Sequence, residues 1–215
     1  IGKKVYYFLA TGNVISSTGL DLMQVAGYTI VAEKLNHWRY LSHFRSVHRG
    51  QFFTEMKTTA PRKLLPESWG FLCCVHTPDG APCGLLNHLC AGAKITTDAV
   101  SAPQLRSVCL SLGMVPVMAS NGSVPIVYST QYLPVFFNGC LIGRISTDQA
   151  TSFCDQLRVL KLTTLQIPSC MEIVFIHPEA QAGGPCPAIY LSTDAARLQR
   201  EVRHLGTGKI ESIGA

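Results

Sequence analysis

Asn138 and Gly139 stand between two apolar runs, LPVFF before them and CLIGRI after them, and this dipeptide constrains the fold more strongly than any other local feature. The two-residue turns that join antiparallel strands need positive φ at one or both positions, which Asn and Gly tolerate better than other residues. The pattern therefore predicts a β-hairpin in the second half of the chain.

Helical patterns flank the predicted hairpin. After it, Ser146 opens the capping-box spacing S-x-x-Q, followed by apolar residues at helical spacing, which predicts an amphipathic helix. Before it, Ser101 is predicted to cap a helix that has Pro103 in its first turn and ends at Gly113. Two further strands, MEIVFI and AIYLS, are separated by the Pro- and Gly-rich HPEAQAGGPCP. These patterns predict an α+β module over residues 96–192.

The two ends of the chain have other patterns. A first helix is predicted to end at Gly12, and apolar residues at helical spacing from Gly27 to about Val47 predict the longest helix. Prolines, glycines and a Thr pair in the next twenty or so residues predict an irregular basic loop. Residues 193–215 leave two alternatives open, a helix or two strands around the sequence GTG.

Length and composition narrow the class of protein. With 215 residues, 47% of them hydrophobic, the chain can bury a core, which argues against disorder. No apolar run approaches the roughly 18 residues of a membrane span, so we predict no membrane partner. Nine cysteines without the spacing of a secreted disulfide scaffold favour reduced thiols inside the cell. Cys109, Cys140 and Cys154 stand in apolar strings and are predicted to lie in the core.

Positive charge is concentrated in the N-terminal part of the chain. Residues 1–95 hold ten Lys and Arg against five Asp and Glu, whereas residues 96–215 hold eight of each. The excess is densest between Lys34 and Lys63, where Glu55 is the one acidic residue. A polyanionic partner requires such a concentration of charge, but a solvated helix face followed by a basic loop has the same composition. Charge alone leaves both interpretations open.

Four cysteines and two histidines crowd the stretch from Trp69 to Cys90, WGFLCCVHTPDGAPCGLLNHLC. These are zinc ligand types, but Cys73 and Cys74 are adjacent and no second ligand pair repeats the first, which disfavours a metal site. A cysteine nucleophile beside His76 stays open, although nothing else in the chain resembles a triad and no phosphate-cradling glycine loop is present. A zinc- or thiol-dependent intracellular interaction module and a small cysteine enzyme are therefore kept as alternatives.

The centre of this stretch predicts a rigid turn. Pro fixes φ, Asp hydrogen-bonds forward to the backbone and Gly supplies the positive φ that closes the turn. The turn either presents a carboxylate in a fixed position or simply connects two strands of the core. Its four residues are Thr77, Pro78, Asp79 and Gly80.

This stretch resembles the signature W-G-x-x-C-P-x-x-T-P-E-G-x-x-x-G-L of the second-largest subunit of multisubunit RNA polymerases, the family known in bacteria as β. LSHFR at residues 41–45 is similar to the family's L-S-H-x-R, and RKL at residues 62–64 to its R-x-L. RGQFF and LPESW, together with the Asp of the turn, resemble the RNA polymerase I branch. The match is specific over about residues 27–90 and thinner beyond, where FFNG is similar to the family's V-F-V-N-G hairpin.

Two positions depart from the signature. Cys74 stands in place of Pro, which loosens a strand end without removing charge, and Asp79 replaces Glu, which shortens the carboxylate by one methylene. The resemblance implies that the stretch forms a rigid wall of the polymerase active centre and that its cysteines mostly serve packing.

The resemblance implies an internal part of a longer subunit, with a fork-like region containing the wall motif in residues 1–95. An external-like α+β domain would occupy residues 96–192, and a segment returning to the polymerase core residues 193–215. The parent enzyme would join ribonucleoside triphosphates on DNA with two Mg²⁺ ions, which the largest subunit holds. This chain would then supply no catalytic residue, metal ligand or cofactor, and would be inactive alone.

Partners and sites follow from the same resemblance. The partners would be the largest and other subunits of RNA polymerase I, the DNA template and the RNA–DNA hybrid, in the nucleus and nucleolus. Contacts to phosphates, which position nucleic acid without reading its sequence, would come from Arg45, Arg49, Lys57, Arg62 and Lys63. Near the triphosphate, the wall would consist of Thr77, Pro78, Asp79 and Gly80, with the Asp79 carboxylate pairing with an arginine across the subunit interface.

Overall fold

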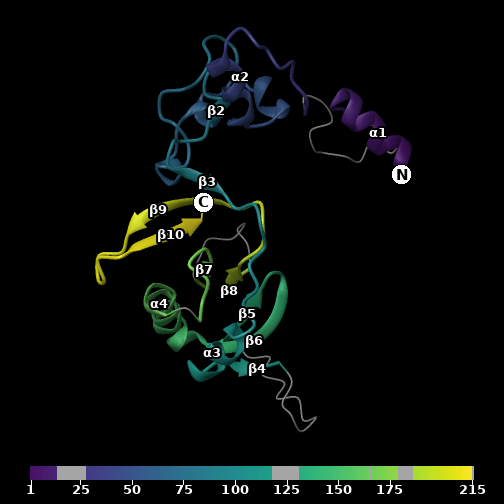
Figure 1. The fold of residues 1–215 in the computed structure, drawn as a ribbon. Coiled ribbons are helices and arrows are strands. Elements are labelled where there is room, and N and C mark those ends of the chain that lie inside the picture. Colours follow the sequence, from purple (N-terminus) through teal and green to yellow (C-terminus); the bar gives the residue numbers. More distant parts are fainter. Residues whose placement is uncertain (14–27, 118–130, 165, 179–185, 215) are drawn as a thin grey trace. The chain divides into compact units, whose positions relative to one another are not determined.

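The computed structural model describes residues 1–13, 28–117, 131–164, 166–178 and 186–214. The chain divides into two compact units, Ile1–Ala93 and Lys94–Ala215, and each is described by itself. Helices and sheets are mixed in the order that Figure 1 labels, so the fold is α+β as predicted. None of the described helices combines the length and the apolar character needed to cross a membrane.

Two helices of the first unit test the sequence patterns. α1 spans Gly2–Thr11 and ends at Gly12, whose φ of 68° terminates the helix as predicted. α2 spans His37–Phe44, so the long helix predicted from Gly27 is wrong over the described residues 28–36. The reason is Asn36, whose side chain accepts a hydrogen bond from the Arg39 amide (2.7 Å) and caps the helix at that point.

The sheet of the first unit joins segments that are distant in sequence. β1 (Ser46–His48) pairs antiparallel with β2 (Leu86–His88), and β1 was missed because it fell at the end of the predicted helix. The segment that follows β1 contains three short 3-10 helices, in which Pro61 and Pro66 occupy first-turn positions. They are η1 (Gln51–Thr54), η2 (Ala60–Arg62) and η3 (Pro66–Ser68).

A five-stranded sheet organises the second unit, in the order β4-β6-β5-β8-β7. β5 and β8 pair in parallel, and the other neighbours are antiparallel. The predicted hairpin is confirmed, since β5 and β6 are joined at Asn138 (φ 46°) and Gly139 (φ 80°). The strands are β4 (Val115–Pro116), β5 (Tyr132–Phe137), β6 (Cys140–Ser146), β7 (Glu172–Ile176) and β8 (Ala188–Ser192).

The two helices of the second unit confirm the predicted periodicities but correct both caps. α4 (Thr147–Thr163) begins after Ser146, yet that side chain makes no capping hydrogen bond, so the capping box is not formed. α3 (Leu105–Ser111) has Gln104 at its N-cap rather than Ser101. Here the chain first makes a turn that brings the Leu105 amide to the Ala102 carbonyl (3.1 Å), and the helix starts only after that turn.

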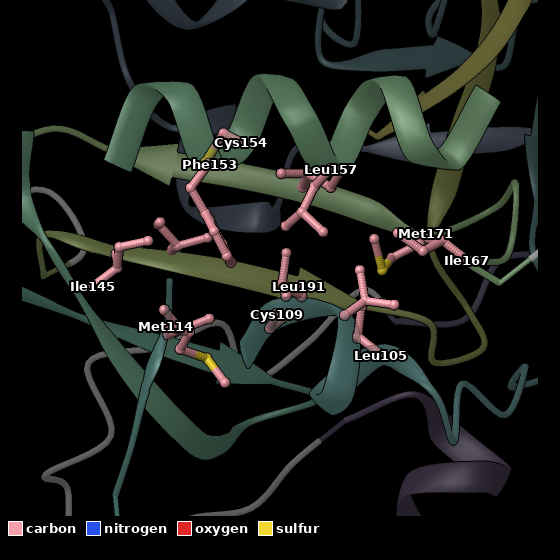
Figure 2. Packing of buried hydrophobic residues seen from close by; sticks show 14 of the residues in the cluster. Leu105, Cys109, Met114, Ile145, Phe153, Cys154, Leu157, Ile167, Met171 and Leu191 are labelled. Carbon is pink, nitrogen blue, oxygen red and sulfur yellow. The ribbon is translucent and has the colours of Figure 1, made fainter. Parts of the chain in front are cut away.

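The core of the second unit is built from α3, α4 and alternating positions of the central strands. Figure 2 shows Phe153 and Leu157 pointing from α4 into this cluster, where Leu191 of β8 also lies. Among the cysteines predicted for the core, Cys109 and Cys154 are buried. Cys140 is exposed, because it is the first residue of β6, at the end of the hairpin directly after the Asn138–Gly139 turn.

The end of the chain forms two strands rather than a helix. β9 (Leu198–Arg203) and β10 (Ile210–Gly214) pair antiparallel, and β9 also neighbours β3 (Ala93–Ile95). Lys161 links α4 to this hairpin. Its buried ammonium donates to the Ser212 carbonyl (2.6 Å) and pairs with the Glu211 carboxylate (3.4 Å). Burial lowers the pKa of Lys161, and the nearby Glu211 carboxylate opposes that effect.

Candidate functional site

The predicted turn lies in a loop that its own threonine closes. The Thr77 hydroxyl donates to the Leu86 carbonyl (2.9 Å) and accepts from the Gly84 amide (2.9 Å), so one side chain ties both ends of residues 77–86. Gly80 has a φ of 83°, which confirms its predicted conformation. Its carbonyl accepts a hydrogen bond from the Cys83 amide (3.1 Å), so the hydrogen-bonded turn begins at Gly80 rather than at Thr77.

Asp79 is exposed at the tip of this loop. Its carboxylate makes no hydrogen bond or ion pair with any described residue, so the predicted forward bond to the backbone is not formed there. The loop is rigid through its other residues, and the carboxylate keeps its full capacity to accept hydrogen bonds.

Arg62 holds the same loop from outside it. Its Nη1 donates to the Ala81 carbonyl (2.5 Å) and to the Cys83 carbonyl (2.8 Å). The backbone of Arg62 also passes against Gly84, where φ is 76°. A Cβ at Gly84 would overlap the Arg62 carbonyl oxygen and lie 2.8 Å from the Arg62 Cβ, so glycine is required on both counts.

A histidine pair supports the start of the loop. His88 of β2 is 5% exposed, and its Nδ1 lies 3.2 Å from the His76 carbonyl oxygen. The two imidazole rings stack with centroids 3.5 Å apart and planes 5° apart. Burial lowers the pKa of His88, and the neighbouring His76, Arg39 and His43 lower it further, although the bond to the His76 carbonyl opposes them. The geometry therefore favours a neutral His88.

The other four cationic residues predicted to contact phosphates have different surroundings. The ammonium groups of Lys57 and Lys63 are exposed and have no hydrogen-bond or ion-pair partner in the described part of the chain. The guanidinium of Arg49 lies over the Phe53 ring, 5.4 Å from its centroid. Arg45 is exposed overall, but its Nη2 donates to the Cys90 carbonyl (2.6 Å). The two lysines are thus the side chains most completely available to an anion.

The cysteines of the stretch are less buried than a packing role requires. Cys74 and Cys83 are exposed, which contradicts the expectation that these cysteines mostly pack. The Cys73 sulfur accepts a hydrogen bond from the His76 amide (3.4 Å), and bonds from the Val75 and His76 backbone lower the pKa of that thiol. Within the described ranges, no group of three or more His, Cys, Asp and Glu is arranged to hold a metal ion.

Sequence reasoning named Arg62 but did not recognise its contacts, and it gave His88 no role beyond possible metal ligand. Both act through backbone carbonyls that are distant in sequence, and no local pattern links residue 62 to residues 81 and 83. The pairing of β1 with β2 could have been suspected from the alternation in SVH and LNH, but runs of three residues are too short to separate from a helix.

Comparisons with known proteins cover both units. The family described as RNA polymerase Rpb2, domain 3 matches residues 30–95, and the one described as RNA polymerase I, Rpa2 specific domain matches residues 142–200. The chain is 45% identical over its whole length to the DNA-directed RNA polymerase I subunit RPA135 of Saccharomyces cerevisiae, of which it covers 17%. It is 46% identical, over 99% of its length, to the human DNA-directed RNA polymerase I subunit RPA2, of which it covers 18%. A probable RPA2 subunit of Schizosaccharomyces pombe is 43% identical over the whole chain, which covers 19% of it. The chain thus spans less than a fifth of the length of these relatives.

Proposed function

Since the chain belongs to the family of RNA polymerase I second-largest subunits, we propose that it forms part of such a subunit and shapes the active centre and nucleic-acid path of the assembled enzyme. The observation that carries this proposal is sequence identity of 43% to 46% along essentially the whole chain, with relatives from yeasts to human. The enzyme's activity would be DNA-templated synthesis of ribosomal RNA, in the nucleus and nucleolus.

The role of the first unit is to line the path of downstream DNA and of the RNA–DNA hybrid. Exposed cations along residues 45–63 support this role, because phosphate contacts supply most sequence-independent affinity for nucleic acids. Lys57, Lys63 and Arg49 would make the stronger contacts. Arg45 and Arg62 would contribute less, because part of each guanidinium is already bound to backbone carbonyls.

Residues 77–80 are the proposed wall of the active centre. The unpartnered Asp79 carboxylate would pair with an arginine of another subunit rather than act as a base, because it is exposed and no described residue already binds it. The Mg²⁺ ions would be held by the largest subunit, so this chain alone would have no activity. Its partners would be the other polymerase subunits, the template and the hybrid.

Salt-dependent binding tests the nucleic-acid role. The affinity of the chain for a fluorescent RNA–DNA hybrid with a downstream duplex would be measured at several salt concentrations. Replacing Lys57 and Lys63 by Ala should reduce the slope of log affinity against log salt by about 0.7–0.9 for each lost phosphate contact.

The matched control replaces Arg106 and Arg203 by Ala. Both are exposed in the second unit without a described partner, and the loss of charge is the same. Equal slopes for the two double variants would contradict the proposed path along the first unit, because they would show that only net charge matters.

A further inference from the structure

We propose that Arg62 is a positioning residue of the wall motif, and that it holds residues 77–84 in the conformation that presents the Asp79 carboxylate to a cation outside this chain. The inference rests on the proposed function, because it explains how that wall keeps its shape. It also gives Arg62 a role other than a phosphate contact.

The side chain of Arg62 binds the loop through hydrogen bonds from a charged donor. One nitrogen of the guanidinium donates to two carbonyls, those of Ala81 and Cys83, at 2.5 and 2.8 Å. Hydrogen bonds from a charged donor are shorter and stronger than those between neutral groups. The delocalised, planar guanidinium is also more weakly hydrated than an ammonium, so it loses less when it is turned from water toward carbonyls.

The backbone of Arg62 lies against the loop as well. Gly84 approaches the main chain of residue 62 so closely that a Cβ would overlap its carbonyl oxygen. The same residue therefore contacts the loop through its main chain at Gly84 and through its side chain at Ala81 and Cys83. A shift of residue 62 would be transmitted to the loop at both places.

Different residues restrain different parts of the loop. The Thr77 hydroxyl ties together the two ends of the loop, and the buried His88 binds the carbonyl that precedes Thr77. Arg62 restrains the segment between those ends. Asp79 lies between Thr77 and Ala81, two restrained points, and its carboxylate has no described partner. Because the backbone on both sides of Asp79 is restrained, less of the chain has to be ordered when its carboxylate binds a cation.

Arg62 is less available for a phosphate contact than Lys57 and Lys63 are. Arg62 is half-buried with Nη1 already bound to two acceptors, whereas the ammonium groups of Lys57 and Lys63 are exposed and have no described partner. A phosphate needs a charge it can reach, and a lysine supplies that charge as well as an arginine does. A side chain that holds a loop through two of its carbonyls needs the planar guanidinium instead.

The experiment uses the assembled polymerase that contains this chain. Arg62→Lys keeps the charge and removes the guanidinium, and Arg106→Lys makes the same change at an exposed position without a described partner. Elongation by the R62K enzyme should lose about ten- to a hundredfold in kcat/KM for the nucleoside triphosphate, because misplaced groups cost that much. The salt dependence of nucleic-acid binding should stay that of wild type, and R106K should match wild type in both measurements.

A double-mutant cycle tests whether Arg62 acts through Asp79. In an Asp79→Asn background, R62K should cost much less than it does alone, because the group that it positions is already lost. Full additivity of the two substitutions would overturn the proposal. So would an R62K enzyme with wild-type kcat/KM.

Hydrogen exchange of the chain itself keeps the proposal testable if the R62K enzyme does not assemble. The Gly84 amide, which donates to Thr77, and the Cys83 amide, which donates to Gly80, should lose protection in R62K and not in R106K. Unchanged protection would overturn the inference. The proposed nucleic-acid path is judged separately, by the slopes of the lysine variants, so either idea can fail alone.

Discussion

Asn138 combines a strained backbone with two side-chain hydrogen bonds, and substitutions can separate the effects of the two on the free energy of unfolding. Its φ is 46°, its Oδ1 accepts from the Thr193 amide (2.8 Å), and its Nδ2 donates to the hydroxyl of the fully buried Thr193 (3.1 Å). Asn138→Ala should lower the free energy of unfolding by about 2–4 kcal/mol, from left-handed strain and buried groups left without partners. Asn138→Gly relieves the strain alone, so urea denaturation should place it between wild type and Ala.

His88 gives the first unit a dependence on pH. Its folded pKa is lowered below the unfolded value of 6.5, so between those two values the unfolded state binds more protons. The stability that comes with a neutral His88 is therefore fully present above pH 6.5, and it is lost as the pH falls through the folded pKa. Hydrogen-exchange protection of β1 and β2 should therefore drop below pH 6.5. The same drop in a His88→Gln variant would show that His88 is not its cause.

The thiols should differ in reactivity according to their surroundings. Burial raises the pKa of Cys109 to about 12 and that of Cys154 to about 11, whereas backbone hydrogen bonds lower the pKa of Cys73. Because the thiolate is the nucleophile, iodoacetamide should modify Cys73 before the exposed Cys83, and Cys109 and Cys154 only after unfolding. Mass spectrometry of timed digests checks the order. Rapid labelling of Cys109 in the folded chain would contradict the described core.

At the scale of elements, α4 carries the core of the second unit. Leu157 is fully buried against the sheet, whereas Val159 on the same helix is 41% exposed. Leu157→Ala should destabilise the second unit by about 2–5 kcal/mol, because it removes buried methyl groups and leaves a cavity. Val159→Ala should change stability by about 0.5 kcal/mol or less. Similar losses for both variants in urea would show that α4 does not pack on this face.

Elements whose signals are local were predictable, and those that depend on distant partners were not. The β5–β6 hairpin and α4 follow from an Asn-Gly turn and from apolar spacing, both of which act over a few residues. The helix expected from Gly27 failed because one side chain, Asn36, outweighed a favourable periodicity. In the loop of residues 77–86, the positive φ of Gly80 was predictable from its residue type. The restraints on that loop were not, because Arg62 and His88 bind carbonyls that only the fold brings near them.

The whole molecule divides unequally between a unit with a core and a unit without one. Among the described residues, the buried hydrophobic side chains of the first unit are Phe71, Leu85 and Ala93, and the other eighteen lie in the second. Trp38 and Phe44 of α2 are 79% and 69% exposed. Amides of the first unit should therefore exchange faster than those of the second in the isolated chain, and should become protected in the assembled polymerase. Equal protection of both units in the isolated chain would contradict this.

The parallel pairing of β5 with β8 also has a consequence for biosynthesis. α4 and β7 lie between these strands in the sequence, so the middle of the sheet stays open until Ser192 has left the ribosome. At a synthesis rate of about 5–20 residues per second, the interval between the synthesis of Phe137 and that of Ser192 lasts roughly 3–11 s. Throughout it, the nascent chain displays an unpaired edge of β5 beside the finished turn at Asn138, and such an edge invites pairing with other chains. A chaperone that covers β5 would therefore be most useful during translation, while this edge is unpaired.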